Sequence, residues 1–179
     1  CNGVVFQLPY VKKIYNLPIS IKQVVVPNPC IPRNHIFPEW LDKGNHIIVS
    51  AGRLCQQKRF DLLISAFDKV CKNHNEYKLI IYGDGPLIKE LQEQINNCEY
   101  AKNSISLSGD VKDVFELAKS AEFFVLSSDF EGIPNVLMEA MAIGMPCIST
   151  DCSPGGARFL LKNGECGLLC PCGDVEKLA

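Results

Sequence analysis

The sequence predicts an α/β fold, a Rossmann-like doubly wound parallel sheet, and three observations predict it. Short apolar runs alternate along the chain with longer segments whose apolar residues recur at helical spacing. The short runs show no polar alternation, which is typical of strands buried on both faces. Glycines and charged residues follow directly after these runs, where open parallel sheets bind their ligands.

Length and composition limit the class of protein. The chain has 179 residues, enough for one domain and a fragment of another, and 47% of them are apolar. The net charge of −2 gives no general attraction for nucleic acid, and no nucleic-acid partner is expected. No apolar run is long enough for a membrane-spanning helix, and no signal peptide precedes Cys1. We expect this chain to be part of a longer, cytoplasmic protein.

Strands are predicted where β-branched and large apolar residues form short runs that stop at turn residues. The run from Ile47 ends at Gly52, and the run from Lys78 ends at the turn Gly83-Asp84-Gly85-Pro86. By the same criterion, the main strands are expected at 47–51, 78–82, 105–107, 123–127, 147–150 and 167–169.

Helices are predicted between these strands from apolar stripes. Apolar residues at 60, 63, 64, 67 and 70 fall on one helical face. A proline near the first turn favours a helix start, as at Pro134. The helices are expected at 60–70, 86–95, 111–118, 134–143 and 157–161.

The first 30 residues differ from the rest. They predict a strand at 4–6, a short helix at 9–15 and a strand at 24–26, which ends in the turn Pro27-Asn28-Pro29. Such a turn is typical of a boundary between structural units.

Ten cysteines are a high count for this length, and most lie within apolar runs. In a large α/β core they are expected to be reduced, buried residues rather than disulfides. Cys166, Cys170 and Cys172 lie close together but lack paired C-x2-C spacing and a nearby histidine. No metal site is therefore expected, and the role of this cluster is left open.

A basic loop follows the strand at 47–51. Arg53 offers a planar fork for phosphate oxygens, and Lys58 offers a compact charge. A solvated basic loop is an equally good interpretation of this segment by itself. The turn at Gly83 lets backbone approach a flat ligand, although a plain turn is the better explanation of this segment by itself.

Two carboxylates, Glu131 and Glu139, flank a Gly-Ile-Pro-Asn turn that runs into an apolar helix. Helix N-termini leave unpaired N–H groups and a partial positive charge, which suit a diphosphate. Glu139 lies about 7 Å along the helix axis, and its side chain leans back toward this end, within reach of a ribose. Glu131 then lies on the other side of the phosphates. The alternative is an acid that stabilises the helix dipole, with an exposed helical glutamate.

In their order along the chain, these segments resemble the donor-binding domain of retaining glycosyltransferases of the group 1 kind, family four, with the GT-B fold. The resemblance spans about residues 24–179 and is carried by 52–61, 82–86, 108–109, 131–140 and 144–146. It implies two facing Rossmann-like domains. Residues 1–26 would be the tail of an N-terminal acceptor domain, otherwise missing here, or a linker. Residues 27–179 would be the C-terminal nucleotide-sugar-binding domain, truncated before its closing helices.

The resemblance also implies roles for individual residues. Arg53 and Lys58 would hold the diphosphate, Glu139 the ribose, and Glu131 the donor sugar. Arg53, Lys58 and Glu131 would form the catalytic group, and the loop 109–111 would meet the base. A UDP-sugar is the expected donor, with no metal or other cofactor. The expected donor contacts are Gly52, Arg53, Lys58, Gly83, Gly109, Val111, Glu131, Gly132, Ile133, Pro134, Asn135, Val136 and Glu139.

The chain departs from the family pattern at two places. Arg59 stands where the family usually has glycine, which keeps the loop basic. The segment Gly155-Gly156-Ala157-Arg158 lacks the acid that members often carry there, so the role of Arg158 is left open.

The resemblance favours a glycosyltransferase of polysaccharide biosynthesis that moves a sugar, with retention, from a nucleotide-diphosphate sugar to a glycan or lipid-linked acceptor. The isolated chain is expected to be inactive, and peripheral contact of the full enzyme with the inner membrane is an open alternative. Two other functions are weighed: a non-catalytic nucleotide-sugar binding module and a GT-B nucleotide-sugar epimerase. The presence of Glu131 beside Arg53 and Lys58 favours catalysis. The donor sugar, the base, the acceptor and the oligomeric state are left open.

Overall fold

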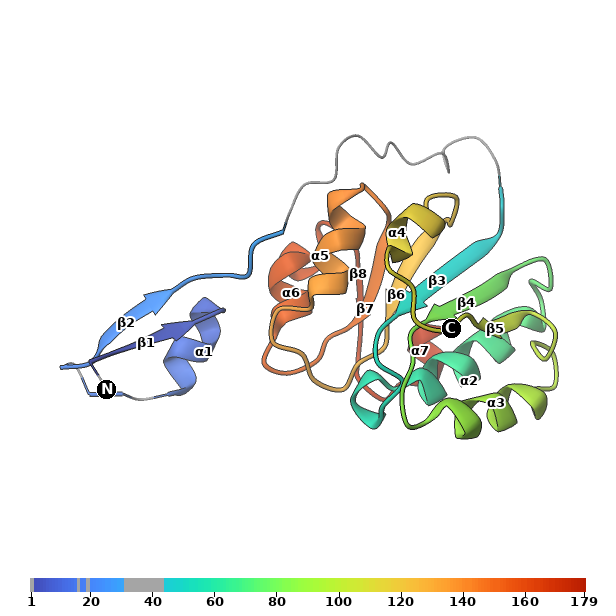
Figure 1. Ribbon diagram of the computed structural model, residues 1–179, viewed down its shortest axis with the longest axis horizontal. Coiled ribbons are helices and arrows are strands. Elements are labelled where there is room, and N and C mark those ends of the chain that lie inside the picture. The colour runs from blue at the N-terminus through green and yellow to red at the C-terminus, as the bar shows by residue number, and fades with distance from the viewer. Residues whose placement is uncertain (1, 16, 19, 31–43) are drawn as a thin grey trace.

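The main body of the protein is a six-stranded parallel sheet with the strand order β5-β4-β3-β6-β7-β8 (Figure 1). The computed structural model describes residues 2–15, 17–18, 20–30 and 44–179. The chain enters at β3 in the middle of the sheet, winds outward to β5, returns beside β3 at β6 and winds the other way. The predicted doubly wound sheet is confirmed. Its strands are β3 (Ile47–Ala51), β4 (Lys78–Tyr82), β5 (Ile105–Leu107), β6 (Phe123–Leu126), β7 (Cys147–Thr150) and β8 (Leu168–Cys170).

Helices cover both faces of the sheet and enclose a separate core on each. On one face are α2 (Phe60–Cys71), α3 (Ile88–Asn96) and α7 (Val175–Leu178); on the other are α4 (Val114–Leu117), α5 (Asn135–Ala142) and α6 (Gly156–Leu160). Consecutive strand residues enter opposite cores: Ile48 packs in the cluster of Phe67, and Val49 packs in the cluster of Leu137. The strands are uniformly apolar because both of their faces are buried.

Some helix boundaries differ from the predicted ones because of local capping. Asp113 accepts a hydrogen bond from the amide of Glu116 at 3.0 Å, and α4 therefore starts at Val114 instead of 111. Pro134 is the residue before α5 and has an extended backbone, so it lies outside the first turn. The short elements η2 (Gln56–Lys58), η3 (Lys162–Gly164) and α7 were not predicted, because none has an apolar period to read.

The first residues form a small unit of their own. Strands β1 (Gly3–Phe6) and β2 (Lys22–Val25) pair in parallel, and α1 (Pro9–Ile14) connects them. A chain of side-chain hydrogen bonds joins this unit to the main body: Gln7 Nε2 donates to Asn28 Oδ1 at 2.6 Å, and Asn28 Nδ2 donates to Asn135 Oδ1 at 2.8 Å. The division into 1–26 and 27–179 remains a prediction, and residues 31–43 of the second part lie outside the described residues.

Candidate functional site

The candidate site lies where the sheet changes its winding direction. Strands β3 and β6 are neighbours, but the chain leaves them toward opposite sides of the sheet. Such a switch point opens a crevice at the carboxyl ends of the two strands. The loop after β3 carries Arg53 and Lys58, and the loop after β6 carries Glu131. The fold thus brings the predicted cations and the first predicted acid to one place.

An ion pair joins these two loops directly. Lys58 Nζ donates to Glu131 Oε1 at 2.6 Å, and Ser128 Oγ donates to the same oxygen at 2.8 Å. Glu131 is 8% exposed, and a carboxylate this deep is stable only when it is paired. Lys58 was predicted to hold the diphosphate and Glu131 the donor sugar; in the structure the two side chains touch.

Gly52 makes room for this ion pair. A Cβ at this position would lie 3.1 Å from Lys58 Cε, because the lysine stem runs over the Gly52 backbone. The φ angle of Gly52, +152°, also favours glycine. Gly52 has no functional group of its own, but the absence of a side chain there leaves room for the Lys58 side chain.

A pocket of about 440 Å³ lies beside the ion pair. Its floor is made of backbone in close contact: a Cβ on Gly83 would overlap the carbonyl oxygen of Gly52, and the amide of Gly83 donates to Gly109 O at 2.7 Å. Val111 packs toward the core, and its neighbour Asp110 lines the pocket in its place. The lining residues are Ala51, Gly52, Arg53, Tyr82, Gly83, Asp84, Asp110, Val114 and Val136.

The two arginines of the first loop differ in how their charges are balanced. Arg53 is exposed at the pocket, and within the described part of the chain no side chain pairs with its guanidinium. Arg59 is held by Asp61 and then Asp129, and these hydrogen bonds raise its pKa further above the usual range. Arg59 was predicted to keep the loop basic, but the carboxylates of Asp61 and Asp129 balance its charge. Arg53 is therefore the arginine of this loop that is exposed at the pocket.

The start of α5 borders the same pocket through Val136. The side chains of Ile133 and Pro134, which precede α5, are buried. Gly132 lies against α6, so closely that a Cβ on Gly156 would overlap the Gly132 carbonyl oxygen. The first amides of an α-helix have no partner inside the helix, which leaves this end electropositive.

Glu139 is half-buried further along α5 and is not among the residues that line the pocket. The structure therefore brings Gly52, Arg53, Gly83 and Val136 together at the pocket, with Lys58 and Glu131 next to it. The expected ribose contact of Glu139 remains a prediction.

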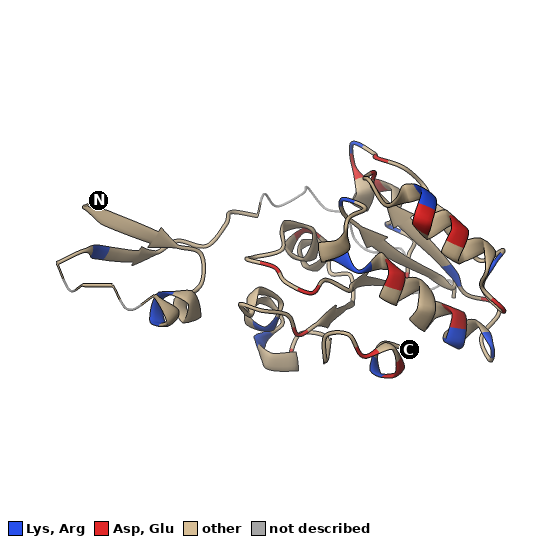
Figure 2. Ribbon diagram, turned by 90° about the horizontal axis from the view of Figure 1, so that it is seen from below, with Lys and Arg blue, Asp and Glu red and all other residues tan. Residues whose placement is uncertain are grey.

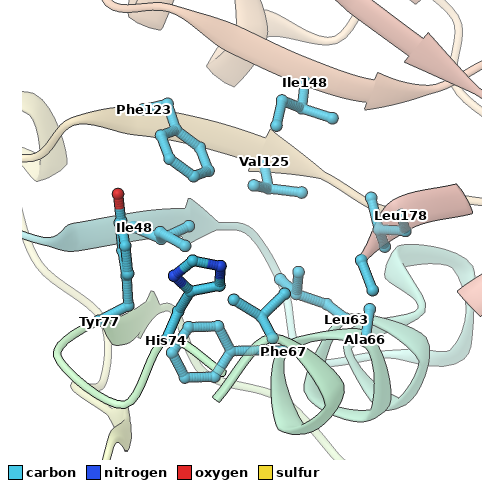
Figure 3. A pocket seen from close by; sticks show the side chains of 12 residues that line it. Ile48, Leu63, Ala66, Phe67, His74, Tyr77, Phe123, Val125, Ile148 and Leu178 are labelled. Atoms are coloured by element: carbon cyan, nitrogen blue, oxygen red, sulfur yellow. The ribbon is translucent and has the colours of Figure 1, made fainter. Parts of the chain in front are cut away.

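Three further hollows lie elsewhere among the described residues. One, of about 470 Å³, is lined by residues that include Phe6, Leu8 and Gly132. Another, of about 740 Å³, surrounds Arg158, whose Nε donates to Asp151 Oδ1 at 2.8 Å, so this arginine is also paired. The third, of about 240 Å³, lies between α2 and the sheet, and Figure 3 shows apolar side chains such as Phe67, Val125 and Leu178 around it. The lining of this third hollow is continuous with the core and offers no catalytic group beyond His74 and Tyr77 at its edge.

Among the described residues, neither a concentration of charge nor a group of metal ligands marks another site. Acidic and basic residues are interspersed over the helices of the main body, as Figure 2 shows. In the described ranges, no three His, Cys, Asp or Glu side chains are grouped so that they could hold a metal ion. Of the helices formed by these residues, none has the length and apolar character to cross a bilayer.

Comparison with known proteins agrees with the fold and shows the family. The family model described as "Glycosyl transferases group 1" matches residues 33–179. An uncharacterised glycosyltransferase of Methanocaldococcus jannaschii is 40% identical over 118 residues, covering 66% of this chain and 29% of that protein. The lipopolysaccharide 1,6-galactosyltransferase of Salmonella typhimurium is 32% identical over 166 residues, covering 91% and 42%.

Among solved structures, a point mutant of S. aureus TarM in complex with fondaparinux, alpha-GlcNAc-glycerol and UDP superposes with a TM-score of 0.84. The sequence identity is 21%, and the match covers 99% of this chain and 35% of that one. This likeness shows the fold. The chain spans less than half the length of these relatives.

Proposed function

Because the chain belongs to the group 1 family of glycosyl transferases, we propose that it is the donor-binding domain of a retaining enzyme. The enzyme would move a sugar from a nucleotide-diphosphate sugar to a glycan or lipid-linked acceptor. The observation that carries this proposal is the Lys58–Glu131 ion pair, which lies beside a pocket lined by Arg53. In this arrangement, cations that would hold a leaving diphosphate lie next to a carboxylate that would face the transferred sugar.

The proposed chemistry follows from the charges that develop during transfer. When the bond between the sugar C1 and the diphosphate oxygen breaks, its electron pair stays on that oxygen, and positive charge develops on the sugar ring. Arg53, Lys58 and the start of α5 would offset the charge of the departing diphosphate, while Glu131 would stabilise the cationic ring. Preorganised charges of this kind are effective because they need no rearrangement during the reaction.

The ion pair also suggests how Lys58 takes part in donor binding. In the structure, the Lys58 ammonium neutralises Glu131, which is almost fully buried. A bound diphosphate offers the ammonium a second anion, and Lys58 would then lie between the phosphate and Glu131. We propose a UDP-sugar as donor, since the TarM structure contains UDP, and a hexose as the sugar, since the Salmonella relative is a galactosyltransferase.

Donor binding is the first test. Calorimetry of this chain with UDP-, GDP- and ADP-sugars should give a saturable signal for one of them. Arg53→Ala should weaken binding by about tenfold or more, because it removes a charged hydrogen-bond fork. The matched control is Arg158→Ala, which removes an arginine of the separate hollow. No binding of any donor at millimolar concentration would refute the donor site.

Turnover in the full-length enzyme is the second test. Glu131→Gln keeps the shape of the side chain and removes its charge, so it should lower kcat far more than it weakens donor affinity. Transfer at a near wild-type rate would assign Glu131 a structural role. Donor binding by the full enzyme without transfer would instead favour a non-catalytic binding module. The isolated 179-residue chain should bind donor and transfer nothing.

A further inference from the structure

Arg59 has a backbone conformation that its side chain does not favour. Its φ and ψ angles, 49° and 43°, lie in the left-handed region, which glycine enters freely and arginine seldom does. The residue connects η2 to α2 at the end of the loop that carries Lys58. A strained conformation of this kind persists when surrounding contacts compensate for it, and such residues gather at functional sites.

The compensating contacts come from two carboxylates. Arg59 Nη1 donates to both oxygens of Asp129, each at 3.1 Å. On the other side of the guanidinium, Nε donates to Asp61 Oδ1 at 3.0 Å and Nη2 donates to Asp61 Oδ2 at 3.1 Å. Asp61 belongs to the same segment as Arg59, in the first turn of α2. Asp129 belongs to the opposite loop, two residues before Glu131, so of the two carboxylate contacts of Arg59 only this one joins the two loops.

Other hydrogen bonds fasten the same two loops along their length. The amide of Asp129 donates to Gln57 O at 2.9 Å, and Gln57 Nε2 donates to Phe130 O at 2.8 Å. Ser127 Oγ donates to Lys58 O at 2.8 Å. The contact between Asp129 and the Arg59 side chain therefore lies at the end of a continuous seam, which holds the two loops side by side.

We propose that Arg59 is a positioning residue, which through Asp129 holds the loop of Glu131 against the loop of Lys58. A guanidinium serves this purpose because its planar fork meets a carboxylate in fixed geometry, whereas a lysine ammonium acts as a point charge. Arg59 and Asp129 are 27% and 39% exposed in their side chains, so solvent screens their attraction, and we assign the pair a geometric role. This role should be measurable as a change in donor affinity, and that measurement rests on the proposed function.

The first arm of the test needs no ligand. Hydrogen exchange is measured in the wild type, Asp129→Ala, Asp61→Ala and Arg59→Gly. Both aspartate variants remove one carboxylate from Arg59, but only Asp129→Ala removes a contact between the two loops. The amides of 127–131 should exchange about tenfold faster in Asp129→Ala and Arg59→Gly, and within about twofold of wild type in Asp61→Ala. Equal exchange in the two aspartate variants would overturn the proposal.

The second arm measures UDP affinity by calorimetry. Asp129→Ala and Arg59→Gly should bind UDP about three- to tenfold more weakly, and Asp61→Ala should bind as the wild type does. Arg59→Lys should recover only part of the affinity. Glycine adopts the left-handed conformation without strain, so Arg59→Gly should still fold, and thermal unfolding checks this.

A double-mutant cycle separates positioning from a general loss of structure. If Arg59 and Asp129 act through Lys58, then Asp129→Ala should cost little further UDP affinity in a Lys58→Met background. Fully additive losses would instead assign the contact to the overall stability of the fold. Should the wild-type chain bind no UDP, the proposed donor would be wrong, and the exchange measurement would still decide whether Arg59 joins the loops.

Discussion

At the scale of single residues, Glu131 shows how a buried charge is compensated by its neighbours. One of its oxygens receives both the Lys58 ammonium and the Ser128 hydroxyl, so the carboxylate is compensated although water is largely excluded. Charge-assisted hydrogen bonds of this type are short and directional, which sets the position of the carboxylate as well as its charge. Glu131 is therefore held in place from two sides.

The cysteines offer a test of burial at the same scale. Burial raises the pKa of Cys147 to about 12, and burial, with Cys172 and Glu131 nearby, raises the pKa of Cys152 to about 12. Only the thiolate reacts with alkylating agents, so at pH 8 roughly one in ten thousand of these thiols is reactive. Iodoacetamide should modify the exposed Cys166 well before either of them, as measured by peptide mass spectrometry.

Unfolding in urea serves as the control for this measurement, because all of the cysteines should then react at similar rates. Alkylation of Cys147 in the native protein as quickly as Cys166 would contradict the core packing around β7.

The types of the site residues could be predicted from the sequence, but their contacts could not. Arg53, Lys58 and Glu131 follow strands, and the carboxyl ends of parallel strands share one edge of the sheet. The direct Lys58–Glu131 pair and the two partners of Arg59 depend on loop backbone geometry, which has no period in the sequence. The left-handed Arg59 in particular carries no residue-type signal, since glycine or asparagine is the usual occupant of that conformation.

At the scale of elements, Asp68 fixes α2 to the turn that precedes β5. Its carboxylate accepts the amides of Glu99, Tyr100 and Ala101 at 3.2, 2.8 and 2.7 Å. Burial by itself would raise the pKa of Asp68, but the three amide donors outweigh it and hold the pKa below its usual value of 3.8.

The sign of this shift fixes the pH dependence of the contact. The lowered pKa means that the folded state favours the ionised carboxylate. Its contribution to stability is therefore present above the unfolded pKa and is lost as pH falls through the lower folded value.

Substitution of Asp68 should therefore destabilise the protein in a pH-dependent way. Asp68→Asn should lower the free energy of unfolding by about 1–2 kcal/mol at pH 7, because the amide side chain accepts weaker hydrogen bonds. The difference from wild type should shrink as the pH is lowered toward 3, as followed by urea unfolding. Glu90→Gln on the exposed face of α3 is the control. A difference that stays constant with pH would contradict the role of the charge.

Most elements could be predicted because the helices carry a periodic apolar stripe and the strands are uniformly apolar. The apolar stripe of α2 and the uniform runs of β3 and β4 match the structure closely. The short elements escaped for a physical reason: η2 consists of Gln56, Gln57 and Lys58, which bury no apolar face. The four-residue helix α7 did carry one readable signal, Asp174, whose side chain accepts the amide of Lys177 and caps it.

At the scale of the whole molecule, the sheet separates two cores that share strands and no helices. Ile64 and Ile81 belong to the core under α2 and α3, and Ile143 belongs to the core under α5. Sites that have no partners in common contribute independently to stability, whereas neighbours in one packed cluster do not.

Stability measurements should detect this separation. Ile64→Val and Ile143→Val should each cost about 1 kcal/mol in urea unfolding. Their effects should add within about 0.5 kcal/mol in the double variant, because the sheet lies between them. The matched pair Ile64→Val and Ile81→Val, which share one core, should depart further from additivity. Strong coupling across the sheet would show that the two cores behave as one.

The glycine contacts around the pocket also decide where this chain can diverge during evolution. Gly83 touches the backbone of Gly52, and Gly156 touches the backbone of Gly132, so any side chain at 83 or 156 would force the loops apart. Gene duplicates that acquire new ligands must therefore change at the open rim, at Asp110 or Val136, while the floor stays invariant. The sequences of its descendants should therefore vary at the rim residues and stay constant at the glycines of the floor.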